Sequence, residues 1–189
     1  MKSINGILYQ LSRPISYVFI RHNDKYLYDW ALPTLLALLV LSSLGFWVDD
    51  WAATFRLVDG IADFVQSLPG FFIAALAAIA TFNRADIDKT MDGRDPPSIH
   101  TRINNNIIDV KLTRRRFLCL LFSYLTVESF IISILGIASV SIGFLDESNN
   151  LVHSIYVTWL FVSVFVFLSC QMLISTLHGL YYLAERVHY

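Results

Sequence analysis

The chain has 189 residues, of which 56% are hydrophobic and 15% are charged, and its formal net charge at pH 7 is -1. An ordinary soluble domain has roughly 45–50% apolar and about 25% charged residues, so the composition excludes that class and indicates a membrane protein. The chain also lacks a broad excess of positive charge, so we expect no direct contact with nucleic acid.

Four apolar stretches are candidates for membrane-crossing helices, each of which needs about 20 residues. The sequence predicts spans at about 30–48, 61–82, 117–145 and 154–183. The second span is the weakest, because its continuous apolar part, Leu68–Phe82, is short for a crossing. A buried helical hairpin is the alternative for that stretch. The predicted fold class is therefore all-α, a polytopic transmembrane helix bundle.

The sign of the charges alternates between the connecting segments. Residues 1–29 and the loop 83–116 are rich in Lys and Arg, whereas residues 49–67 are mainly acidic and the short loop at Asp146 and Glu147 has no basic residue. Basic loops stay on the cytoplasmic side of a membrane. The pattern predicts a multi-pass protein with four crossings, both termini in the cytoplasm and a cytoplasmic loop 83–116. It favours a true second span, because without it a basic loop would lie outside.

Residues 1–29 are predicted to form a cytoplasmic amphipathic segment, followed by a transmembrane domain over residues 30–189. Apolar residues recur at helical spacing in the first part of this segment: Ile4, Ile7, Leu8 and Leu11. Two placements remain open. The segment either lies on the inner leaflet, or packs beneath the bundle or a partner.

Glu128 is the most informative polar residue, because it lies well inside the third predicted span. A carboxyl group in hydrocarbon is costly and usually faces a bundle interior or a water-filled cavity. At 1.5 Å per residue, Gln171 lies at a similar depth, and Ser42 and Ser43 fall near the same level. The sequence predicts one polar layer near mid-membrane. Glu128 is either a neutral, hydrogen-bonded structural group or part of an ion path or a proton-sensitive switch.

A second pattern concerns helix packing. Gly70, Ala74 and Ala78 recur every four residues in the second span. Faces of small residues let helix backbones approach closely in lipid. We expect this face to be buried, either within the chain or between subunits. The small extramembrane mass leads us to expect a homo-oligomer.

Arg114, Arg115 and Arg116 directly precede the third span. They anchor the span on the cytoplasmic side, and contact with anionic lipid headgroups is compatible with that role. The sequence has no phosphate-binding motif, no zinc-protease motif and no cluster of cysteine and histidine. We therefore expect no enzyme activity, no cofactor and no metal.

Chain size, the four-span layout and the region Asn83–Ser123, with its basic stretch Leu112–Cys119, resemble the KwaA family, the small membrane subunits of the Kiwa antiphage defence system of bacteria. The resemblance covers the whole chain. It implies a homotetramer in the bacterial inner membrane that senses phage infection and works with a soluble, cytoplasmic DNA-binding partner. It provides no site residues.

Three function classes remain open from the sequence. A membrane sensor or scaffold that signals to a cytoplasmic partner is favoured by the long loop 83–116 and the extended N-terminal segment. A pore-forming effector would need a continuous polar stripe, but only Glu128 and Gln171 are strongly polar in mid-span. A membrane protein conferring immunity to a bacteriocin would place its recognition surface outside, where the predicted loops are short.

Overall fold

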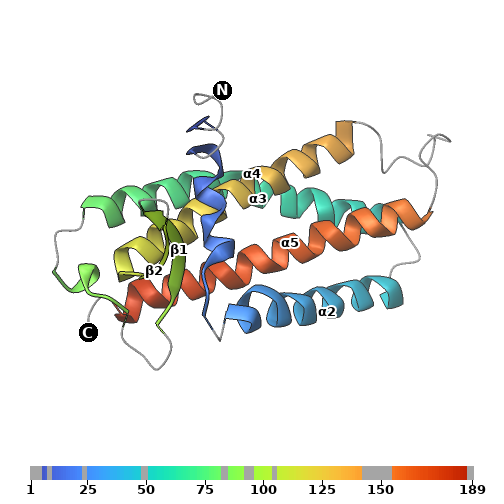
Figure 1. Ribbon diagram of the computed structural model, residues 1–189. Coiled ribbons are helices and arrows are strands. Elements are labelled where there is room, and N and C mark those ends of the chain that lie inside the picture. Colours follow the sequence, from blue (N-terminus) through green and yellow to red (C-terminus); the bar gives the residue numbers. More distant parts are fainter. Residues whose placement is uncertain are drawn as a thin grey trace.

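The computed structural model describes residues 6–7, 10–22, 25–47, 51–81, 85–91, 96–103, 106–141 and 155–186. Four long helices run alternately in opposite directions and pack side by side (Figure 1). The named elements are η1 (Arg13–Phe19), η2 (Leu27–Ala31), α2 (Leu32–Trp47), α3 (Trp51–Thr81), η3 (Ala85–Asp88), β1 (Ser98–Ile103), β2 (Asn106–Lys111), α4 (Arg114–Ser141), α5 (Ile155–Tyr181) and η4 (Tyr182–Arg186).

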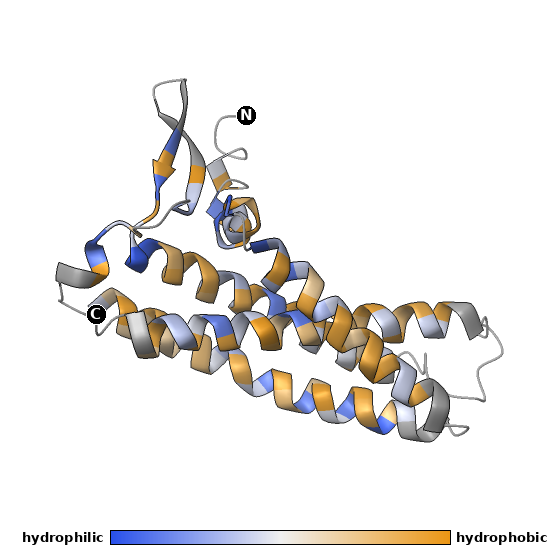
Figure 2. Ribbon diagram, turned by 90° about the horizontal axis from the view of Figure 1, so that it is seen from below, coloured by the Kyte–Doolittle hydropathy of each residue, from blue (hydrophilic) through white to orange (hydrophobic). Residues whose placement is uncertain are grey.

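All four long helices are long and apolar enough to cross a membrane. The qualifying segments are Leu27–Leu44, Thr54–Thr81, Arg114–Ser139 and Val157–Ala184. Hydrophobic residues predominate along the long helices (Figure 2). Many of them are exposed on the outside of the bundle, including Leu38, Phe64 and Phe71, which are each more than half exposed. Such a surface suits lipid rather than water. The prediction of a four-span, multi-pass helical bundle is confirmed at this level.

The second span begins much earlier than the sequence predicted. α3 starts at Trp51 rather than at residue 61, so it includes Arg56 and Asp59, which the prediction placed in a loop, as well as Asp63. These charged side chains all lie on the exposed face of the helix. The opposite face is apolar and buried at Val58, Ala62, Val65, Phe72 and Ile79. The first turns of α3 are amphipathic, so charged residues interrupt the apolar ones along the sequence. A search for continuous apolar runs therefore misses the start of this helix.

The N-terminal segment contributes to the bundle core. η1 packs across α4, with Tyr17 and Ile20 only 3% and 4% exposed, whereas Leu11 and Phe19 on its other side are 70% and 71% exposed. The segment therefore packs against the bundle, which is one of the two predicted placements, and contact with the inner leaflet stays a prediction for its exposed side. Among the residues that predicted an amphipathic helix, Ile4 and Leu8 lie outside the described part of the chain.

A β-hairpin lies within the predicted polar loop 83–116, which makes the fold helical with one small sheet rather than purely α. β1 and β2 pair antiparallel from Ser98 with Lys111 to Ile103 with Asn106. The hairpin projects from one end of the bundle (Figure 2). Its base is buried through Ile99 and Leu112. We call residues 85–91, 96–103 and 106–113 the cap.

Candidate functional site

Two acidic side chains are buried to almost the same extent where the N-terminal segment meets the bundle. Asp29 in η2 is 5% exposed and Glu128 in α4 is 4% exposed. Acidic groups are almost never this buried unless they are paired. We call these two residues, together with Tyr17, Lys25 and Tyr124, the buried polar cluster.

Asp29 has a complete set of partners. The Tyr17 hydroxyl donates to Asp29 Oδ1 at 3.1 Å, and Lys25 Nζ lies 3.3 Å from Asp29 Oδ2. Lys25 Nζ also donates to the backbone oxygens of Tyr17 and Val18, both at 2.8 Å. It lies 4.6 Å from the centre of the Tyr17 ring. Lys25 therefore neutralises Asp29 and ties η1 to the start of the first span.

The surroundings of this pair influence its titration. Burial lowers the pKa of Lys25, and the neighbouring Asp29 carboxylate opposes that shift. Burial also raises the pKa of Tyr17, and the charge of Asp29, its hydrogen bond and the nearby Tyr124 and Glu128 raise it further. Tyr17 consequently stays a neutral hydroxyl that donates and accepts hydrogen bonds.

Glu128 differs from Asp29 in having no hydrogen bond. Both of its carboxyl oxygens are buried and, among the described residues, have no hydrogen-bond partner. Tyr124 lies one helical turn earlier on the same face and interacts with Glu128 electrostatically, but short of hydrogen-bond geometry. The Tyr124 ring is centred 5.2 Å from the Tyr17 ring. Polar groups therefore follow one another from Asp29 through Tyr17 and Tyr124 to Glu128.

Contacts between α4 and α5 show what faces Glu128 on the neighbouring helix. A side chain at Gly179 would lie 3.0 Å from Leu121, and one at Gly136 would lie 3.7 Å from Phe165. These two crossings define an antiparallel register, and Glu128 falls between them. Interpolation places residues 171–175 of α5 around its level.

Two buried polar residues of α5 occupy this level. Gln171 is 9% exposed, and Ser175 is 1% exposed with no hydrogen-bond partner for its hydroxyl among the described residues. The register agrees with the depth predicted for Gln171, although no hydrogen bond links it to Glu128. Ser42 and Ser43 do not join them. Both are exposed on α2, and their hydroxyls donate to carbonyl groups of the same helix.

In the part of the chain that the structure describes, the predicted packing face of α3 is not buried against another helix. Gly70, Ala74 and Ala78 are all exposed, and a Cβ atom at Gly70 would meet nothing within 4 Å. The close helix approach occurs elsewhere, where a Cβ atom on Gly136 would lie 2.5 Å from that of Ala62. Only the contact between subunits remains as a prediction for the small face.

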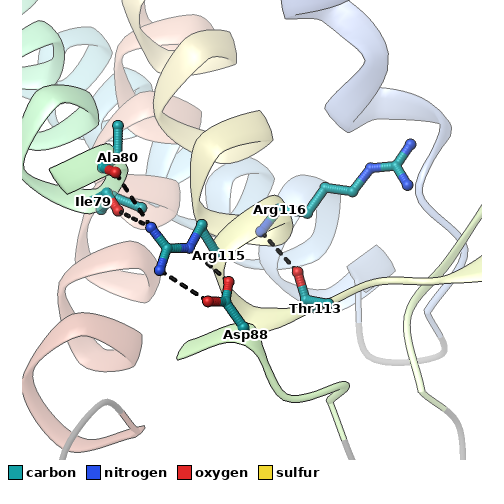
Figure 3. Close-up of polar contacts among 6 residues, drawn as sticks. All are labelled: Ile79, Ala80, Asp88, Thr113, Arg115 and Arg116. Atoms are coloured by element: carbon teal, nitrogen blue, oxygen red, sulfur yellow. Dashed lines mark hydrogen bonds and ion pairs between the residues drawn. The ribbon is translucent and has the colours of Figure 1, made fainter. Parts of the chain in front are cut away.

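The three arginines before α4 have different surroundings (Figure 3). Arg115 Nε and Nη2 bind the two oxygens of Asp88 at 2.7 and 3.0 Å, and Nη1 donates to the carbonyls of Ile79 and Ala80. These carbonyls end α3 and lack partners within the helix. The Arg116 side chain points away from this group. Arg115 thus joins α3, the cap and α4, and lipid contact stays a prediction for Arg114 and Arg116.

An open cleft of about 580 Å³ lies between the N-terminal segment and the cap. Its lining includes Arg21, Lys25, Asp29, Ser98 and Asp109. Because Asp29 belongs both to this lining and to the buried polar cluster, the cleft gives the cluster a route to water. Within the described residues, no group of three His, Cys, Asp or Glu side chains lies close enough to hold a metal ion.

Sequence reasoning found Glu128 but missed the other four members of the cluster. Two signals were present, since Lys25 and Asp29, like Tyr124 and Glu128, are spaced by four residues and therefore share a helix face. Comparison of the chain with protein-family models, with curated proteins and with solved structures finds no match. The function therefore has to be argued from the site.

Proposed function

We propose that this chain is a bacterial inner-membrane sensor and scaffold of antiphage defence, which transmits a change in its helix bundle to a soluble cytoplasmic partner through the cap. The observation that supports this most is the direct backbone link between the segment carrying Tyr17 and strand β1. Arg21 N donates to Ser98 O at 3.0 Å, and Ser98 N donates to Arg21 O at 3.2 Å.

Members of the buried polar cluster flank Arg21 in the sequence. Tyr17 precedes Arg21 by about one helical turn, and Lys25 follows it and returns to the Tyr17 carbonyl. A shift of η1 against α4 would therefore displace Arg21, and β1 with it. Coupling between distant sites travels through such chains of hydrogen bonds and rigid elements.

Backbone hydrogen bonds join the segments of the cap to one another and the cap to the start of α4. Leu112 N donates to Pro97 O at 2.9 Å, and Met91 N donates to Leu112 O at 3.1 Å. Arg114 N donates to Lys89 O at 3.2 Å directly at the start of α4. The cap is thus a folded platform rather than a loose loop, which suits recognition by a protein partner.

The proposal takes the cytoplasmic side of the cap from the positive-inside pattern, and the partner from the resemblance to the KwaA family. That resemblance implies a soluble DNA-binding protein and a homotetramer. The exposed small face of α3 (Gly70, Ala74 and Ala78) offers a seam at which two copies can approach closely.

A challenge experiment tests the proposal. Cells carrying this gene together with the gene of a candidate soluble DNA-binding partner are infected with phage, and partner and chain are co-purified. Lys111→Glu reverses an exposed charge on β2 and should abolish both protection and co-purification, whereas Arg56→Glu, on the exposed face of α3, should keep both. Undiminished protection after a Gly/Ser linker replaces residues 98–111 would contradict the role of the cap.

A second candidate function is ion conduction by the oligomer. Asp59, Asp63 and Gln66 are exposed on α3 on the same outward side as Gly70 and Ala74. Rings of acidic side chains select cations in channels. Purified protein in planar bilayers would then show discrete conductance steps that Asp63→Asn alters. A silent bilayer containing correctly assembled oligomer would exclude this candidate.

A further inference from the structure

We infer that Glu128 is a proton-binding site that exchanges its proton with the cytoplasmic cleft through Tyr124, Tyr17 and Asp29, and that release of this proton loosens η1 from α4. The proton site stands on the geometry alone. Only its role as the stimulus of the sensor rests on the proposed function.

The buried carboxylate of Glu128 can be neutralised only by a cation that requires neither additional space nor further ligands. No described neighbour donates a hydrogen bond to its oxygens. Leu125, Ser129 and Ile132 on the same helix have no exposed surface, so the packing is tight. A metal ion would require several oxygen or nitrogen ligands, and no suitable group of acidic or histidine side chains is present in the described residues. A proton neutralises the carboxylate without either requirement.

A route for this proton follows from the order of the polar groups. Asp29 lines the open cleft and accepts a hydrogen bond of 3.1 Å from the Tyr17 hydroxyl. Tyr124 lies next to Tyr17, and Glu128 lies one turn further along α4. Hydroxyl groups both donate and accept, so each can pass on one proton while receiving another. Rotation of each hydroxyl about its C–O bond turns it from accepting a proton to donating one.

The exchange is balanced without any further reactant. The Glu128 carboxyl gives up one proton to the Tyr124 hydroxyl, which releases its own toward Tyr17. Tyr17 releases its proton to Asp29, and Asp29 gives one to water in the cleft. Both tyrosines end as neutral hydroxyls, and Glu128 ends as a carboxylate.

The groups facing Glu128 from the packed elements leave its negative charge uncompensated. η1 presents Tyr17, and η2 presents Asp29 with its bound Lys25. α5 presents the uncharged Gln171 and Ser175 at the level of Glu128. Further titratable groups lie elsewhere: His178 stacks on Tyr28 nearer the cap, and Arg56, Asp59 and Asp63 of α3 are exposed on its outer face.

Loss of the proton therefore sets two carboxylates against one lysine in the cluster. Uncompensated charge in a low-dielectric interior is strongly unfavourable. The repulsion is relieved by moving η1, which carries Tyr17 and leads to Asp29, away from α4. Since Arg21 is paired with Ser98, such a movement reaches the cap.

Infrared difference spectroscopy of the purified protein in nanodiscs tests the proton site. The carbonyl band of a protonated carboxyl should disappear reversibly as the pH is raised, should be absent in Glu128→Gln, and should persist in the control Asp88→Asn, which removes an exposed carboxylate outside the buried polar cluster. Tyr17→Phe keeps the ring but removes the hydroxyl, so it should slow deuterium exchange of this carboxyl. If Glu128→Gln does not fold, Glu128→Asp should shift the band to a new frequency.

Two results would overturn the inference: a titrating band that Glu128 variants leave unchanged, or a wild-type band that does not respond to pH. Neither depends on phage protection. A confirmed band in a protein that confers no protection would refute the proposed function alone.

Discussion

Asp29 and Glu128 can be compared directly, because both side chains are carboxylic acids and both are buried to the same extent, yet their hydrogen-bonding surroundings differ. Asp29 is held by a lysine and a tyrosine hydroxyl, whereas Glu128 has no hydrogen bond among the described residues. Breaking a buried ion pair strands a charge, but an isolated carboxyl escapes that penalty by binding a proton. Equal burial thus allows a structural role for one acid and a titrating role for the other.

The largest effect should come from removing the partner of Asp29. Lys25→Met leaves Asp29 buried without a cation and should lower the free energy of unfolding by about 3–5 kcal/mol. Denaturant titration in detergent measures this loss. The double variant Lys25→Met/Asp29→Asn removes both charges and should regain most of it. If the single variant alone unfolds at the wild-type midpoint, Lys25 does not stabilise the first span.

A smaller effect should follow from disturbing the helix that positions Glu128. A Cβ atom on Gly136 would lie 2.5 Å from that of Ala62, so Gly136→Ala forces α3 and α4 apart. Overpacking of this kind costs roughly 1–3 kcal/mol. The matched control is Gly70→Ala, which meets empty space and should cost nothing. Equal thermal unfolding of the two variants would contradict this packing.

The Arg115–Asp88 pair extends the comparison to an exposed ion pair. Asp88 has a side-chain exposure of 58%, so solvent screens the interaction far more than at Asp29. Asp88→Asn should therefore cost at most about 1 kcal/mol, because Arg115 still binds the end of α3. A loss comparable to that of Lys25→Met would show that the cap depends on this carboxylate.

Glu128 should be the most tolerant position of the comparison. A hydrogen-bonded Glu128 would make Glu128→Leu strand its partners, but no described group is hydrogen-bonded to it. Both Glu128→Gln and Glu128→Leu should therefore leave unfolding nearly unchanged at acidic pH, where the carboxyl is protonated in the folded and in the unfolded chain. Both should nevertheless abolish the biological response, because neither binds an exchangeable proton. Full activity of Glu128→Leu with normal stability would make Glu128 an incidental residue.

Sequence reasoning could reach the four spans and the interior position of Glu128, because both follow from the cost of placing polar groups in hydrocarbon. It could not reach the start of α3. Asp59 and Asp63 look like loop residues until the helix is seen to turn them outward. Nor could it identify Asp29, which sits at the end of a span where charges are ordinary.

The buried polar cluster depends on a tertiary contact that has no local signature. Tyr17 approaches Tyr124 only because η1 crosses α4, and spacing along the chain contains no record of that crossing. The same holds for the small face of α3. A pattern of Gly70, Ala74 and Ala78 indicates close packing but not the partner, and within this chain that partner is absent from the described residues.

The most direct test of the account compares wild type with Glu128→Gln in their free energy of unfolding across pH. If Glu128 carries the inferred proton, the folded state binds one proton more than the unfolded chain near neutral pH, and stability falls as pH rises. One such proton corresponds to a slope of about 1.4 kcal/mol per pH unit. We predict that the wild type shows this additional decline and that Glu128→Gln does not. Parallel curves would contradict a proton on Glu128.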